Sequence, residues 1–238
     1  MDETEFFNFK FSQVIQSLCG VPREQRDFKW AENFLTYIPT AAMVAGEPPV
    51  QTGPDGFPYF ALKFPPEGEE IDAYSVVYLL EHVCQEGMGI AVNPNPRSKD
   101  VDWIFSYGDL WNFALTGEFY SDPTRNNFST ASEGSPPTEV MIAQPSESFF
   151  PQYVREVIAR GLKETFAIPA PSVVMVIDPK SSSGRSLAFN VFVEDFEKQD
   201  LYDFAMRFLS WSLPRDYGLI EAKKSAVYAK SFSPLIEE

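Results

Sequence analysis

His82 is the single histidine of the chain, and Cys19 and Cys84 are its two cysteines. Catalysis by a cysteine–histidine pair would have to use these three residues. A Cys–His catalytic pair needs the two side chains to face each other. His82 and Cys84 stand two positions apart in a stretch with helical periodicity, and residues at that spacing point in different directions on a helix. Both cysteines also lie in apolar patterns that are typical of buried free thiols. We therefore predict a chain without catalytic residues.

Carboxylates offer a second kind of chemistry, because two neighbouring acids can bind a divalent cation or act as general acid and base. Asp100 and Asp102 flank a predicted strand, and Glu194 and Asp195 end another. However, the chain has 34 acidic residues, so such pairs arise by chance, and no calcium-loop spacing is present. We predict no metal site and no cofactor, and we keep a carboxylate- or metal-dependent enzyme as an alternative.

The segment from Lys180 to Ser186, KSSSGRS, has the composition of a phosphate-binding loop. In a P-loop the lysine follows the second glycine and a helix comes next. Here the lysine comes first, Gly184 is the one glycine, and a strand is predicted to follow. The segment is therefore interpreted as a hairpin tip.

An aromatic cluster is the strongest candidate for a binding site. Five aromatic residues fall within eleven positions and two more follow at once: Trp103, Phe105, Tyr107, Trp111, Phe113, Phe119 and Tyr120. Tyr and Trp are enriched in binding hot spots, because they offer a large rigid surface and a polar group. Trp103 and Phe105 fit a core strand. Tyr107, Trp111 and Tyr120 are predicted to line a binding groove, with core packing of Tyr107 and Trp111 as the alternative.

The charge of the chain limits its partners. It carries 34 acidic and 19 basic residues, a formal net charge of −15, and its densest basic spot is the pair Lys223–Lys224. Binding to nucleic acid needs clustered Lys and Arg that release counterions from phosphates. We therefore expect no nucleic-acid or membrane partner, and a basic or amphipathic protein partner if the acidity serves more than solubility.

The N-terminal residues MDETEFFNFKF begin with acids, whereas a secretory signal has a basic start and a longer apolar run. No stretch approaches the roughly 20 apolar residues that span a bilayer. The sequence thus predicts a cytoplasmic protein.

Helical and strand periodicities alternate along both halves of the chain. Helices are expected at about 3–18, 24–37, 73–86, 110–116, 151–166 and 200–213, and strands at 41–45, 59–64, 88–92, 101–107, 140–143, 173–177 and 187–193, with weaker strands at 219–221 and 227–228. Residues 121–139 are rich in Ser, Thr, Pro, Asn, Gly and Glu, which is typical of a linker. We predict an α+β fold with two small antiparallel sheets and helices packed on one face. The predicted domains are 1–120 and 140–238, unless both halves share one sheet system.

Several short segments resemble the bacterial SseB (enhanced serine sensitivity) family over about residues 30–238. They are GIAVNP at Gly89–Pro94, VMIAQP at Val140–Pro145 followed by a helix from Pro151 and the strand Val173–Ile177, SWSLP at Ser210–Pro214, and SFSPL at Ser231–Leu235. The N-terminal helix, the 121–139 segment and Ala143, where the family tends to have Gly, depart from the pattern. The resemblance implies a cytoplasmic bacterial α+β protein and assigns no catalytic residue.

Together these observations predict a non-enzymatic cytoplasmic binding or adaptor protein. An immunity or antitoxin-like protein that masks a basic partner is an alternative, since the acidity fits it equally well. A carboxylate- or metal-dependent enzyme is the second alternative.

Overall fold

The computed structural model describes residues 6–66, 68–95, 100–120, 141–177 and 185–236. The chain divides into two compact units, Met1–Leu110 (unit 1) and Trp111–Glu238 (unit 2), and each is described by itself. The division falls inside helix α4 (Tyr107–Thr116), ahead of the predicted linker. That linker, 121–139, lies outside the described residues, as does the predicted hairpin tip up to Gly184.

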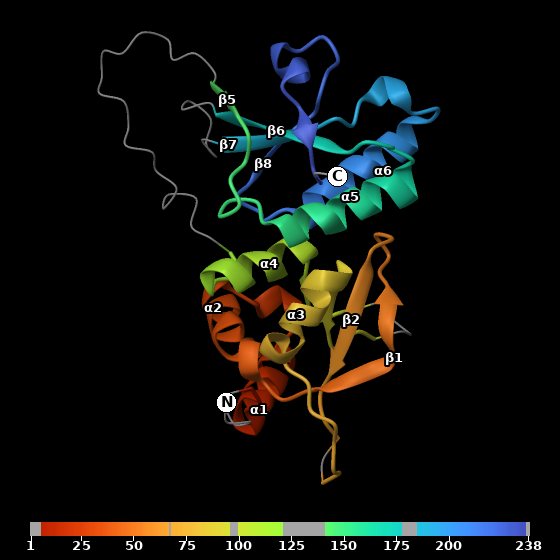
Figure 1. The fold of residues 1–238 in the computed structure, drawn as a ribbon. Helices are drawn as coiled ribbons and strands as arrows, with labels where there is room; N and C mark the ends of the chain where they lie inside the picture. Colours follow the sequence, from red (N-terminus) through yellow and green to blue (C-terminus); the bar gives the residue numbers. More distant parts are fainter. Residues whose placement is uncertain (1–5, 67, 96–99, 121–140, 178–184, 237–238) are drawn as a thin grey trace, which may run out of the picture. The chain divides into compact units, whose positions relative to one another are not determined.

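Unit 1 contains a four-stranded sheet in the order β1-β2-β3-β4. Strands β1 and β2 of this sheet are labelled in Figure 1. Its strands are β1 (Val44–Thr52), β2 (Pro58–Lys63), β3 (Gly89–Val92) and β4 (Trp103–Phe105). The pairs β1–β2 and β3–β4 are antiparallel, whereas β2 and β3 are parallel, with Phe60 opposite Ile90. Parallel neighbours need a crossover connection, and helix α3 (Val76–Glu86) supplies it.

The helices of unit 1 begin at side-chain caps. They are α1 (Phe9–Cys19), α2 (Phe28–Tyr37) and α3, with the short 3₁₀ turns η2 (Arg23–Gln25) and η3 (Ile38–Thr40). The side chains of Asn8, Asp27 and Ser75 accept hydrogen bonds from free backbone N–H groups in the first turns of α1, α2 and α3. Gly87 adopts φ 75° and ends α3.

Unit 2 contains a five-stranded sheet in the order β5-β6-β7-β8, with β9 also paired to β6. Its strands are β5 (Met141–Ala143), β6 (Ser172–Ile177), β7 (Arg185–Phe189), β8 (Gly218–Ile220) and β9 (Ser233–Pro234), and its helical segments are α5 (Gln152–Phe166), η5 (Val193–Asp195), α6 (Gln199–Ser212) and η6 (Val227–Lys230). The strands β7 and β8 are parallel and the other pairs are antiparallel. Helix α6 lies in the connection between the two parallel strands.

The predicted α+β class with two sheets is confirmed. Each sheet is mixed, however, and not wholly antiparallel. In each sheet a helix, α3 or α6, returns the chain to the end of the sheet at which the preceding strand began, so the next strand runs parallel to it. Several local predictions are wrong. The strand predicted at 187–193 ends at Phe189, and of the strand predicted at 41–45 only Val44 and Ala45 lie in β1. The segment 227–228 lies in η6, and the strand predicted at 101–107 ends at Phe105.

Candidate functional site

The structure places Tyr107 and Trp111 in the core. Both side chains have a relative exposure of 0%. The Tyr107 hydroxyl donates to the Cys84 carbonyl at 3.0 Å within unit 1, and the Trp111 Nε1 donates to the Ser212 carbonyl at 2.8 Å within unit 2. Their polar groups are therefore satisfied inside the protein, and the groove predicted from these two residues is not formed.

Tyr120, the third predicted binding residue, is half-buried in unit 2. The Arg215 guanidinium lies 4.3 Å from the centre of its ring, and Arg215 Nη2 lies 3.3 Å from its hydroxyl oxygen. A cation of the chain itself thus covers one face of the ring. The role of Tyr120 in binding stays a prediction.

The thiols are unsuited to nucleophilic chemistry. Burial raises the pKa of Cys84 to about 12, and burial followed by the nearby Asp102 carboxylate raises the pKa of Cys19 to about 12. A thiol attacks as its thiolate, so burial disfavours the nucleophilic form of both cysteines. On α3 the side chain of His82 is exposed and that of Cys84 is buried, so the two face different ways.

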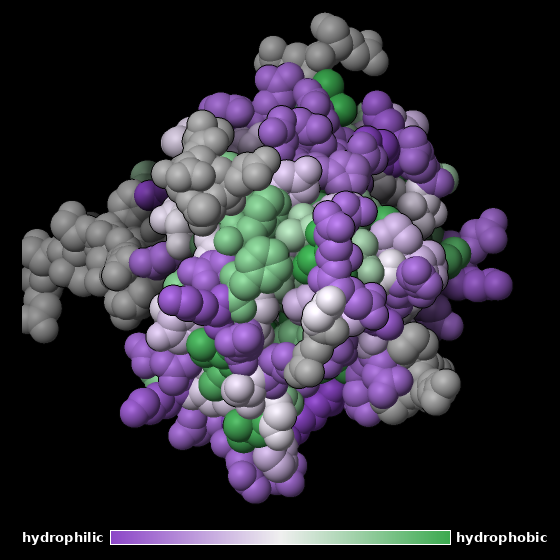
Figure 2. Space-filling model, turned by 90° about the horizontal axis from the view of Figure 1, so that it is seen from below, coloured by the Kyte–Doolittle hydropathy of each residue, from purple (hydrophilic) through white to green (hydrophobic). Residues whose placement is uncertain are grey.

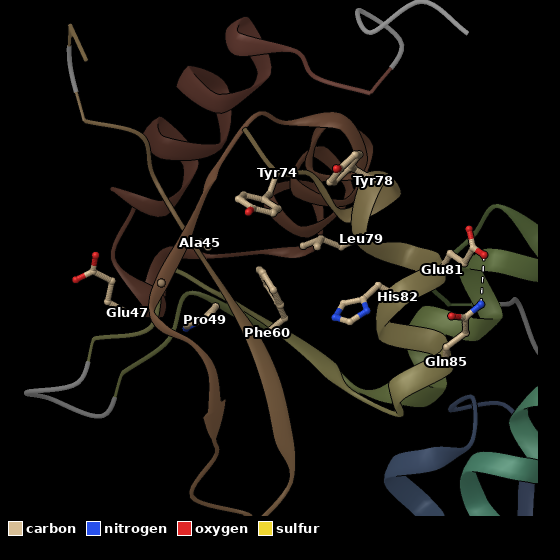
Figure 3. A pocket seen from close by; sticks show the side chains of 11 residues that line it. Ala45, Glu47, Pro49, Phe60, Tyr74, Tyr78, Leu79, Glu81, His82 and Gln85 are labelled. Atoms are coloured by element: carbon tan, nitrogen blue, oxygen red, sulfur yellow. Dashed lines mark hydrogen bonds between the residues drawn. The ribbon is translucent and has the colours of Figure 1, made fainter. Parts of the chain in front are cut away.

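An open cleft of about 780 Å³ lies in unit 1 and is here called the α3 cleft (Figure 3). One wall is the start of β1, the floor is Phe60 of β2, and the other wall is α3 with the residues just before it. The lining residues are Ala45, Gly46, Glu47, Pro49, Phe60, Tyr74, Tyr78, Leu79, Glu81, His82 and Gln85. Sequence reasoning did not identify this cleft.

The β1 wall departs from regular pairing. The register between β1 and β2 shifts between Ala45 and Val50, so a bulge lies at the mouth of the cleft. A Cβ on Gly46 would lie 2.7 Å from the Cβ of Ala61, so only glycine permits the close approach of the two strands there. Pro48 and Pro49 have no N–H to donate to a further strand. The two prolines therefore disfavour the addition of a strand along this stretch of β1.

Aromatic rings form a continuous path along the cleft. The rings of Phe60 and Tyr74 lie 5.8 Å apart between centroids, and those of Tyr74 and Tyr78 lie 6.1 Å apart. Phe60 is 7% exposed whereas Tyr78 is 53% exposed, so the path runs from the core to the surface. Beyond Tyr78 it continues to Phe7, whose ring centroid lies 5.2 Å away.

Polar groups of the cleft are acidic or neutral. Figure 3 shows the His82 ring pointing toward Phe60, while the carboxylates of Glu47 and Glu81 point away from His82. Gln85 Nε2 donates to Glu81 Oε1 at 3.2 Å. The described residues that line the cleft include no lysine or arginine. The two carboxylates thus lie at the margins of the cleft, and neither is directed at the imidazole.

Two further observations concern metals and membranes. Within the part of the chain that the structure describes, no three or more His, Cys, Asp or Glu side chains gather in a way that could hold a metal ion. No helix among the described residues has the length and apolar character needed to cross a membrane.

In the view of Figure 2, apolar residues form small patches between hydrophilic ones.

The chain matches no family model, no curated protein and no solved structure. The resemblance to the SseB family therefore stays a prediction, and the function has to be argued from the residues of the site.

Proposed function

We propose that this chain is a non-enzymatic binding protein whose α3 cleft holds a basic or amphipathic segment of a protein partner. The observation that supports this most is the exposed ring of Tyr78, 53% accessible at the end of an aromatic path that leads into the cleft. Exposed aromatic anchors of this kind are typical of binding hot spots.

The chemistry of the cleft favours a cationic ligand. The faces of Tyr74 and Tyr78 attract Lys and Arg groups through the ring quadrupole and give apolar side chains a surface to bury. Glu47 and Glu81 line the same cleft, and its described lining residues include no lysine or arginine. The net charge of −15 also favours the approach of a basic partner over distances up to the Debye length.

We infer a bacterial cytoplasmic setting of the SseB-like kind for this function. The free thiols of Cys19 and Cys84 support a reducing compartment. An immunity or antitoxin-like role is the second candidate, because the acidic charge would serve equally to mask a basic toxin. Such a role predicts a tight one-to-one complex that abolishes the activity of the partner.

The test is selection of peptides from a random displayed library on the full chain, followed by binding titrations of the selected peptides. We expect sequences enriched in Lys or Arg beside aromatic or aliphatic residues. Replacement of Tyr78 by Ala should weaken binding roughly tenfold or more, as loss of a hot-spot residue does. Glu81→Gln should weaken binding less, and mainly at low salt.

Val227 supplies the matched control, because it is 88% exposed and lies in unit 2. Val227→Ala should leave the affinity unchanged. Selected peptides that lack basic residues, or that bind Tyr78→Ala as tightly as the unchanged chain, would overturn the proposal. Turnover of a substrate that depends on His82 would overturn its non-enzymatic part.

A further inference from the structure

A second, smaller pocket lies in unit 2. It is lined by residues at and after the end of α5 and by the segment around η5. Its volume is about 210 Å³. That is below the roughly 300–1,000 Å³ of pockets that enclose drug-sized ligands, so it suits a single small group. Three phenylalanines and one carboxylate dominate its lining, namely Phe166, Phe192, Phe196 and Asp195. These four residues are called the Phe pocket below.

The three rings are held in place by other aromatic side chains. Phe166 packs edge-on against Phe204 at 5.4 Å, Phe192 against Phe232 at 6.0 Å, and Phe196 against Tyr202 at 5.7 Å between centroids. All three are half-buried, so each presents part of its surface to the pocket. The aromatic walls are therefore positioned before any ligand arrives.

An ammonium group of the chain itself already contacts the ring of Phe192 and the carboxylate of Asp195. The Lys224 Nζ lies 5.5 Å from the centre of the Phe192 ring and forms an ion pair with Asp195 Oδ1. The side chains of Lys224 and Asp195 are 52% and 49% exposed. Ion pairs that are this exposed add little to stability, so a competing cation can replace the lysine.

The remaining polar side chain of the lining, Asn190, makes hydrogen bonds within the chain. The Asn190 side chain accepts from the Ser172 backbone N–H at 2.7 Å and donates to the Ala170 carbonyl at 2.9 Å. Its amide is thus occupied in fixing the loop between α5 and β6. Among the described lining residues the charged group is the Asp195 carboxylate, which favours a cation.

We propose that the Phe pocket binds a small organic ammonium ion of the methylated or quaternary class, which competes with the Lys224 ammonium for Phe192 and Asp195. The rings of Phe166, Phe192 and Phe196 surround the methyl groups and attract the charge, and Asp195 neutralises it. Quaternary ammonium ions suit aromatic enclosures because they are weakly hydrated and lose little on leaving water. This site is independent of the α3 cleft.

The experiment is titration of the full chain with choline chloride at constant ionic strength, followed by heteronuclear NMR of the backbone amides. We expect saturable shifts in residues 190–196. Lys224→Ala should tighten binding by roughly threefold to tenfold, because the Lys224 ammonium no longer competes for Phe192 and Asp195. Phe192→Leu should weaken binding by roughly tenfold and keeps an apolar side chain of similar size.

Lys223→Ala is the matched control, since it removes the same charge from the neighbouring exposed residue. It should change choline affinity little. The neutral isostere 3,3-dimethylbutan-1-ol should not bind, which separates cation recognition from simple apolar burial.

Three outcomes would overturn the proposal. They are the absence of saturable shifts in both the unchanged chain and Lys224→Ala, equal effects of Lys224→Ala and Lys223→Ala, and equal binding of choline and its neutral isostere. The amide spectrum of each variant reports whether it is folded. Tyr78→Ala should leave choline binding unchanged, so failure of one site is distinguishable from failure of the other.

Discussion

The guanidinium of Arg26 and the carboxylate of Asp102 form an ion pair with 2.7 Å between Nη2 and Oδ1 and side chains only 11% and 15% exposed. Arg26 also donates to the backbone carbonyls of Cys19 and Val21, each at 2.9 Å, and its guanidinium lies 4.7 Å from the ring centre of Trp30. One side chain thus joins the α1–α2 connection to the residues that lead into β4. The Arg26–Asp102 ion pair therefore holds these two segments of unit 1 together.

Replacement of Asp102 by Ala should therefore destabilise unit 1. It removes the carboxylate that pairs with the Arg26 guanidinium and accepts from the Asn93 amide at 2.7 Å. Arg26 then keeps only backbone carbonyls as acceptors. Removal of one partner of a buried ion pair typically costs about 3–5 kcal/mol. Urea denaturation followed by tryptophan fluorescence measures the loss. In Asp100→Ala the lost pair with Arg23 is exposed, at 3.6 Å, so its cost should stay below about 1 kcal/mol. Equal costs would contradict this interpretation.

The burial of Trp111 predicts that its replacement affects folding and not partner binding. Trp111→Ala removes the hydrogen bond to Ser212 and the ring contacts to Phe150 and Tyr217 at 6.5 and 5.5 Å. The cavity should cost about 3–5 kcal/mol, measured by chemical denaturation. Leu115 lies on the same helix and is 45% exposed, so Leu115→Ala should change stability by less than about 0.5 kcal/mol. A stable Trp111→Ala variant that has lost a partner would restore the groove interpretation.

The position of Tyr107 shows what the local sequence pattern predicts about secondary structure and what it misses. Alternation of Trp103, Phe105 and Tyr107 indicates a strand, and the strand exists up to Phe105. The Ser106 side chain then accepts from the Asp109 N–H at 3.1 Å while the Asp109 carboxylate accepts from the Ser106 N–H at 3.0 Å. This reciprocal capping box begins α4 at Tyr107 and turns its ring into the core. The signal is present in the sequence as Ser106 and Asp109.

The α3 cleft left a partial signal in the sequence. Tyr74, Tyr78 and His82 are spaced four residues apart, which places them on one side of the predicted helix, away from the buried Val76 and Val83. The opposite wall could not be predicted, because the bulge between Ala45 and Val50 depends on how β1 pairs with β2. The parallel pairing of β2 with β3 was also missed, because periodicity identifies strands but not their neighbours.

The Phe pocket had no sequence signal at all. Its walls come from Phe166, at the end of α5, and from Phe192 and Phe196, on either side of η5. The ammonium that contacts Phe192 and pairs with Asp195 comes from Lys224. Contacts between segments so distant along the chain follow from tertiary packing alone.

The close approach of β3 to its neighbours predicts that Gly89 tolerates no side chain. A Cβ there would lie 2.5 Å from the Tyr59 ring and 2.6 Å from the Phe105 backbone oxygen. Because a backbone atom cannot move aside as a side chain can, Gly89→Ala should cost about 1–3 kcal/mol in the free energy of unfolding. At Gly20 the nearest contact is the Ser17 oxygen at 3.3 Å, so Gly20→Ala should have a much smaller effect. Similar melting temperatures for the two variants would contradict the packing described for β3.

Burial of Cys84 predicts a loss of stability in alkaline solution. Its pKa rises from 9.0 to about 12 in the folded chain. Above pH 9 the unfolded thiol loses its proton while the folded thiol keeps it, so the folded state binds more protons and stability falls with rising pH. The fall approaches about 1.4 kcal/mol per pH unit for this thiol and continues until the folded pKa is reached. Below pH 9 both states are protonated and the contribution is constant.

Cys84→Ala removes this dependence and adds a packing loss that does not vary with pH. The difference in unfolding free energy between the unchanged chain and Cys84→Ala should therefore shrink as the pH is raised from 9 toward 12. Val83→Ala is the matched control, because Val83 is buried on the same helix and does not titrate. Its difference from the unchanged chain should stay constant over the same range. Parallel curves for the unchanged chain and Cys84→Ala would mean that the thiol is as accessible to water when folded as when unfolded.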